Sequence, residues 1–169
     1  DVESDKIDAF TQVHDLKNYP QYCVVVGNNK KSAVRRNFDM AHELGHIILH
    51  SSIENIDELS QEQLREIENE ANLFAAAFLM PKDAFLRDLI TPTNIVSYVT
   101  LKEKWHVSIG AMIIRAKSLG IIDMKQYQSL MKAMSYRKWR TKEPLDDKLA
   151  VPYPTLFTSA IEILFEKTG

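Results

Sequence analysis

The sequence predicts a mostly helical α+β domain with a small N-terminal β-sheet. Its 169 residues include only five glycines and six prolines, about half the usual share, which disfavours a fold built from many short strands. Residues 22–26 form a short β-branched run, and residues 27–31 have turn-forming composition. Residues 32–36 are expected to return as a second strand, and from Asn37 onward the apolar spacing becomes helical.

The first helix is expected over residues 40–49, with Asn37 or Asp39 as its N-cap. A capping-box sequence at Ser60 predicts a long second helix that runs toward Met80. The second half of this helix is apolar all round, so we expect it to be buried on most sides.

Further helices are expected over residues 82–89, 94–104, 108–118, 124–134 and 155–166. Pro81 can begin the first of them, Gly120 can end the third, and Asp123 opens the fourth with another capping-box pattern. The chain divides into a domain over residues 1–135 and a basic linker with an amphipathic C-terminal helix over residues 136–169.

Composition excludes several classes of protein. Lysine and arginine total 21 against 23 acidic residues, so no overall positive field indicates nucleic-acid binding. The single cysteine, Cys23, cannot form an internal disulfide and is expected to be a buried thiol. No apolar run reaches the roughly 18 residues of a membrane span, and no signal peptide is evident, so a cytoplasmic location is expected.

The segment with the clearest chemistry contains His42, Glu43 and His46. Two histidines four residues apart lie on one helix face, one turn apart, so both imidazoles can reach one metal ion. Glu43 projects about 100° away from His42. It can therefore act as a general base toward water on zinc, whose pKa the metal lowers to about 7.

The alternative is a solvated histidine pair on an ordinary helix. The apolar character of residues 40–49 favours a metal site, because an unpaired polar stripe would be costly there. Gly45 in mid-helix costs about 1 kcal/mol relative to alanine and predicts that another element approaches closely.

A catalytic zinc site needs a third protein ligand. His50 lies two turns beyond His42, and a role as a cation at the helix C-terminus is the simpler interpretation. Glu66, Glu68 and Glu70 all lie where a neighbouring helix could bring in a carboxylate, and helical angles do not separate Glu68 from Glu70.

Sequence blocks over residues 24–122 resemble the ImmA/IrrE family of zinc metallopeptidases. The blocks are Arg35-Arg36-Asn37-Phe38, Ala41-His42-Glu43-Leu44-Gly45-His46, His50, Glu70-Ala71-Asn72-x-Phe74-Ala75 and Leu79-Met80-Pro81. The resemblance implies a zincin-like fold with a helix-turn-helix-like segment at about residues 94–122. It also implies that His42, His46 and Glu70 bind Zn²⁺ and that Glu43 is the catalytic base.

The same resemblance implies a zinc-dependent endopeptidase that regulates transcription in bacteria or their mobile elements by cleaving a helix-turn-helix repressor. Because the sequence begins with Asp1, we expect it to be the C-terminal piece of a regulator and peptidase fusion. DNA binding would then use a part of the longer chain that is not present here. The C-terminal helix offers a possible homodimer surface.

Two other classes of function stay open. One is a non-catalytic, zinc-containing sensor domain of a transcriptional regulator. The other is a DNA-binding module that uses residues 107–122, with Arg115 and Lys117 as contacts. A packing role for that segment, and a solvated tether for the basic run over residues 137–142, are the simpler interpretations.

The remaining parts of a peptidase site are less defined in the sequence. A strand over residues 23–26 could pair with an extended substrate, or could simply belong to the core. Donors for an oxyanion could come from His14, Tyr22, Arg35, Tyr98 or His106.

Overall fold

The computed structural model describes residues 9–16, 19–26, 32–53 and 55–150, with Ile163 and Phe165. Within these ranges a two-stranded sheet is followed by six α-helices, with one 3-10 turn after the first helix. The mostly helical α+β class is therefore confirmed. The helix expected over residues 155–166 lies outside the described residues, apart from Ile163 and Phe165. The elements are β1 (Ala9–Leu16), β2 (Tyr19–Val26), α1 (Ala33–His50), η1 (Ile56–Glu58), α2 (Gln61–Leu79), α3 (Lys82–Asp88), α4 (Ile95–Trp105), α5 (Ile109–Ser118) and α6 (Met124–Tyr136).

The sheet is a hairpin of β1 and β2, which pair antiparallel from Ala9 opposite Val26 to Leu16 opposite Tyr19. The prediction of a partner strand over residues 32–36 is wrong, because α1 already begins at Ala33. Ser32 has the extended backbone of an N-cap residue, and the next two side chains, Ala33 and Val34, are buried. The true partner, β1, lies in a segment whose sequence has little periodicity.

The predicted caps are confirmed for α2, α5 and α6 but are wrong for α1, which begins at Ala33, seven residues earlier than expected, with Ser32 and not Asn37 or Asp39 as its N-cap. Ser60 and Gln63 form the reciprocal capping box at the start of α2, with backbone-to-side-chain distances of 3.2 and 2.9 Å. Asp123 and Gln126 do the same for α6, and Ser108 caps α5. These predictions are confirmed because a cap depends on residues only three positions apart.

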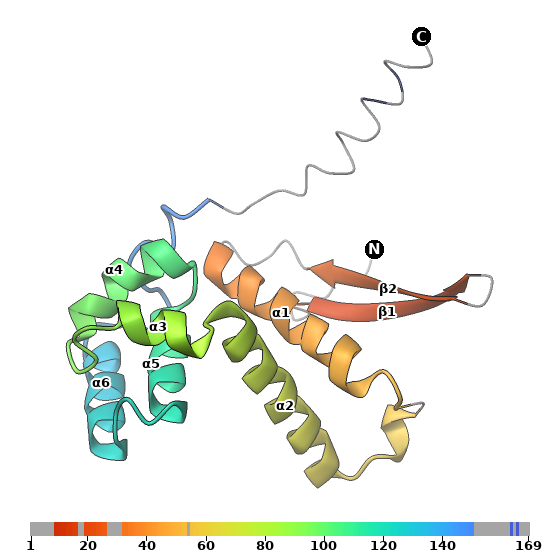
Figure 1. Cartoon of the computed structure of the whole chain (residues 1–169), viewed down its shortest axis with the longest axis horizontal. Coiled ribbons are helices and arrows are strands. Elements are labelled where there is room, and N and C mark those ends of the chain that lie inside the picture. The colour runs from red at the N-terminus through yellow and green to blue at the C-terminus, as the bar shows by residue number, and fades with distance from the viewer. Residues whose placement is uncertain are drawn as a thin grey trace.

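Helix α1 lies between the hairpin and α2, and it packs against both (Figure 1). Gly45 is buried where α1 and α2 meet. A Cβ atom at Gly45 would lie 3.2 Å from the Ala71 Cα and 3.1 Å from the Phe74 ring. The predicted close approach of another element at Gly45 is thus confirmed, and the element is α2.

Helices α3 to α6 form a second cluster beside the first helix pair (Figure 1). Their core includes Phe85, Tyr98, Met112 and Ile113, all fully buried. Residues 137–150 pack back onto this cluster, since the Trp139 ring contacts its core and Glu143 is buried.

A buried ionic network joins this returning segment to α4. The Lys102 side chain is fully buried and donates to Glu143 Oε2 at 2.8 Å and to Asp146 Oδ1 at 2.6 Å. Glu143 also accepts from the backbone of Ile109 and Gly110 at the start of α5. Burial alone would raise the pKa of Asp146, but hydrogen bonds from Lys102, the Glu143 backbone and Ser32 hold it below its ordinary value.

Two expectations about burial are wrong. The second half of α2 is not enclosed, because Leu73 and Phe78 are 57% and 58% exposed. Cys23 is exposed on β2 rather than buried. No helix in the described ranges combines the length and hydropathy needed to cross a bilayer.

We expect Gly45→Ala to be less stable than Gly110→Ala by about 1–3 kcal/mol, because the new methyl group lies 3.2–3.3 Å from backbone atoms of Ala71, which a side-chain rotation cannot relieve. Gly110→Ala is the matched control, since its Cβ would meet only ordinary contacts at 3.8 Å and alanine favours the helix. Urea unfolding of both variants measures the difference. Equal stability of the two would contradict the tight contact.

We expect Lys102→Met to lower the free energy of unfolding by about 3–5 kcal/mol, because the buried Glu143 and the partly buried Asp146 lose their cation. The control is Lys104→Met on the same helix, which removes the exposed ion pair with Asp88 and should cost about 0–1 kcal/mol. Urea titrations followed by circular dichroism compare the two variants. A Lys102→Met protein as stable as Lys104→Met would show that the network contributes nothing.

Candidate metal centre

Helix α1 presents a ladder of three histidines along one side. The ring centroids of His42 and His46 are 4.7 Å apart, and those of His46 and His50 are 5.2 Å apart. The Nε2 atoms of His42 and His46 face each other at 3.0 Å. The predicted convergence of the two motif histidines is therefore present in the structure.

The carboxylate that meets this pair comes from Glu68 on α2. Its oxygens lie 3.3 Å from His42 Nε2 and 3.5 Å from His46 Nε2. Among the residues that the structure describes, these three side chains form the one group whose ligand atoms could hold a metal ion, all within 4.8 Å of one another.

The structure does not bring Glu70 to this cluster, although the sequence resemblance implied that it would be the third ligand. Glu70 Oε2 instead lies 2.9 Å from His50 Nε2. Residues 68 and 70 project about 200° apart around a helix, so only one of them can face the point where His42 and His46 meet. Glu66 is exposed and is not in the cluster either.

The hydrogen bonds made by the outer nitrogens of the three histidine rings indicate which nitrogens carry protons when the rings are neutral. Asn72 Oδ1 lies 3.1 Å from His42 Nδ1, so this nitrogen carries the proton that it donates to the amide oxygen. A neutral His50 ring that donates from Nε2 to Glu70 has an acceptor at Nδ1, which lies 3.1 Å from His46 Nδ1. Both Nε2 atoms of the pair are then left with lone pairs.

This arrangement fits a metal cation. With neutral rings in the tautomers given above, two imidazole lone pairs and a carboxylate converge, and such a set of acceptors is stabilised by a positive ion. Burial, and next the neighbouring His42, lower the pKa of His46, which favours the neutral ring that a metal requires. Two nitrogens and one oxygen are also the donor set of many catalytic zinc sites.

Glu43 lies in the same cleft, which has a volume of about 390 Å³ and is lined by both histidines, Glu68 and Asn72. Its Oε2 accepts a hydrogen bond of 2.7 Å from the Thr11 hydroxyl on β1. Sequence reasoning missed Thr11, since nothing in the pattern of residues 1–20 marks it. The hairpin thus contributes a polar contact to the site.

The five candidate oxyanion donors lie elsewhere, and none is among the described residues that line this cleft. Tyr98 is buried in the helical cluster, where its hydroxyl donates to the Pro92 carbonyl and burial raises its pKa to about 12. His106 is the left-handed C-cap of α4, and Arg35 donates to the Thr141 carbonyl.

The helix-turn-helix-like segment packs into the core. Val107, Ile109 and Met112 are fully buried. Arg115 donates from Nε to the Met80 carbonyl, and Lys117 lies over the Tyr127 ring at 4.8 Å. The two residues considered as DNA contacts therefore have structural contacts within the domain.

A helix that carries His-Glu-x-x-His, with a carboxylate from the next helix, is the arrangement of a metallopeptidase. Comparison with protein families agrees: residues 1–117 match the peptidase M78 family, described as the IrrE N-terminal-like domain. Because this match covers more than half of the chain, the protein belongs to that family, and the resemblance to ImmA/IrrE proteins is confirmed. A comparison with curated proteins gives no significant match.

Proposed function

We propose that this protein is a zinc-dependent endopeptidase. The observation that carries the proposal is the convergence of His42, His46 and Glu68 in a cleft that also contains Glu43. Membership of a peptidase family supports peptide-bond hydrolysis as the reaction. A zinc ion held by these three residues would keep a fourth position for water or substrate, which separates catalytic zinc sites from structural ones.

In this proposal Glu68, not Glu70, is the third ligand. Asn72, four residues after Glu68, fixes the His42 ring through its amide oxygen. Glu70 holds His50, and His50 in turn orients the His46 ring. Such outer partners commonly set the tautomer and the orientation of metal-binding histidines. Glu70 thus acts through other residues, as a positioning residue.

When bound, the ion supplies Lewis-acid chemistry, polarising a carbonyl oxygen and making water more acidic. Glu43 takes the proton from the water that attacks the carbonyl carbon and returns it to the leaving amine as the C–N bond breaks. Thr11 holds one oxygen of Glu43, which limits the rotation of the carboxylate and leaves its other oxygen for this proton.

The proposed substrate is a repressor-type transcription factor with a helix-turn-helix, cleaved in the cytoplasm. Support for this substrate comes from the resemblance to the ImmA/IrrE family. The alternative is a zinc-containing sensor without catalytic activity. The contact between Thr11 and Glu43 favours the enzyme, because a sensor needs no oriented base beside its metal.

We expect purified protein to contain about one zinc ion per chain, and His42→Ala and Glu68→Ala to lose it. Glu70→Ala should keep zinc with an affinity about 10–100-fold weaker, because it only orients a ligand through His50. Glu66→Ala, an exposed neighbour on α2, is the control. Elemental analysis and competition with a chelator measure these outcomes. Retention by Glu68→Ala with loss by Glu70→Ala would restore Glu70 as the third ligand.

We expect Glu43→Gln to lower turnover by about 10²–10⁴-fold, because glutamine cannot accept the proton. Zinc content and the melting temperature should stay unchanged, since Glu43 is not in the ligand cluster. Mass spectrometry of a helix-turn-helix repressor and of unfolded casein, incubated with each protein, measures cleavage. Equal cleavage by Glu43→Gln and the wild type would exclude Glu43 as the base. Zinc-loaded wild-type protein that cleaves neither substrate would favour the sensor.

A further inference from the structure

A second, larger cleft adjoins the metal centre. It has a volume of about 630 Å³, within the range of about 300–1,000 Å³ in which ligand pockets usually lie. Helices α1, α2, α5 and α6 and the segment after α6 contribute to its walls. Phe38, Asp39 and Asn72 line both this cleft and the one that contains Glu43. A ligand in the larger cleft would therefore lie next to the proposed catalytic residues.

The floor of this cleft is mainly apolar and is open to solvent. Leu73 on α2 and Ile114 on α5 are 57% and 52% exposed, and both line it. Met131 and Met134 on α6 line it as well. Methionine side chains are long and flexible, so such a surface adapts to different apolar partners. The unexpected exposure of Leu73 is explained if a ligand covers it.

Cations surround this apolar floor. Arg35 and Arg140 line the cleft, and each makes one side-chain hydrogen bond within the described ranges, to the Thr141 carbonyl and to the Ser135 hydroxyl. A guanidinium has five N–H donors, so each arginine retains donors for a carboxylate. Two acids, Asp39 and Glu143, also line the cleft, and Lys102 shares its one positive charge between Glu143 and Asp146. With Arg115 the lining holds three arginines, so the cations outnumber the acids.

We infer that this cleft binds the part of the protein substrate beside the cleaved bond, as a segment that carries both apolar side chains and a carboxylate. The inference rests on the proposed peptidase function and adds which side chains of its substrate the enzyme recognises. Apolar side chains would cover Leu73 and Ile114, and an aspartate or glutamate would meet Arg35 or Arg140. Because the two clefts adjoin, the backbone of the same segment reaches the cleft of Glu43.

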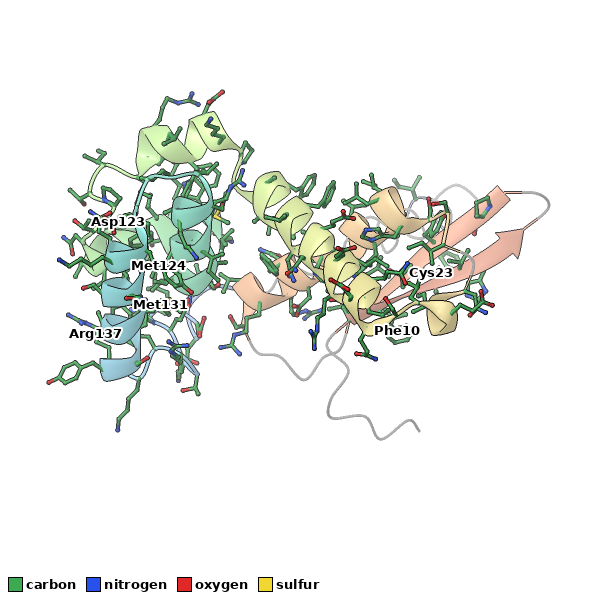
Figure 2. All side chains as sticks on the ribbon, turned by 90° about the horizontal axis from the view of Figure 1, so that it is seen from below. Phe10, Cys23, Asp123, Met124, Met131 and Arg137 are labelled. Atoms are coloured by element: carbon green, nitrogen blue, oxygen red, sulfur yellow. The ribbon has the colours of Figure 1, made fainter. Side chains whose placement is uncertain are left out.

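Binding can be measured without cleavage. The Glu43→Gln protein is labelled with ¹³C at its methionine methyl groups and observed by NMR. The peptide Leu-Met-Phe-Asp-Glu, or its counterpart that ends in Lys-Lys, is then added. The acidic peptide should shift the signals of Met131 and Met134. The Met124 signal should not move, because this residue lies on α6, is exposed and does not line the cleft (Figure 2). Equal shifts with the basic peptide would overturn the proposed preference for a carboxylate.

Two matched pairs of variants locate the contacts. Ile114→Glu should weaken binding of the acidic peptide by about tenfold or more, while Val96→Glu, an equally exposed apolar position on α4, should not. Arg140→Glu should weaken it similarly, while Lys125→Glu, a cation on α6 outside the cleft, should not.

The inference and the proposed function can fail separately. Cleavage of casein by the wild type, with unmoved Met131 and Met134 signals and no effect of Ile114→Glu on cleavage, would overturn the cleft and leave the peptidase intact. Shifts of these signals that Arg140→Glu weakens, with no cleavage by zinc-loaded protein, would support the cleft as a peptide-binding site and remove the peptidase.

Discussion

The contact between α1 and α2 at Gly45 determines the geometry of the whole site. With no side chain at Gly45, the backbone of Ala71 approaches closely enough that His42 and His46 on one helix meet Glu68 on the other. A larger residue would separate the helices, and metal sites tolerate little change in the distances between their ligands. Glycine lowers the intrinsic stability of α1 relative to alanine, but its missing side chain is what lets the two helices approach at the site.

Around this contact, some side chains of α1 and α2 form the candidate metal cluster and others orient the histidine rings. His42, His46 and Glu68 face one another, whereas the surrounding groups Asn72, His50 and Glu70 bind the outer nitrogens of the rings and orient them. The hairpin contributes Thr11 to Glu43 from a third element. Three elements distant in the sequence therefore combine on one cleft, and each supplies a different kind of contact.

Features that depend on neighbouring residues could be predicted from the sequence. Both capping boxes, most helix positions and the facing pair of His42 and His46 were predictable because each rests on residues three or four apart. The position of Glu68, rather than Glu70, opposite the two histidines was not, since it depends on which side of α2 faces α1. The pairing of β1 with β2 and the contact of Thr11 with Glu43 require tertiary structure, and no local pattern marks them. The spacing of Glu68 and Asn72, four residues apart and therefore on one face of α2, was the available signal.

The network at Lys102 shows that the folded domain extends beyond the residues that match the family. The match ends at residue 117, yet the cation at Lys102 is neutralised by Glu143 and Asp146, beyond that boundary. Asp146 also accepts from Ser32, at the start of the histidine helix. A fragment cut at the edge of the matched region would lack both carboxylates that pair with Lys102 and the partner of the Ser32 hydroxyl. The minimal piece for expression therefore extends at least to residue 146.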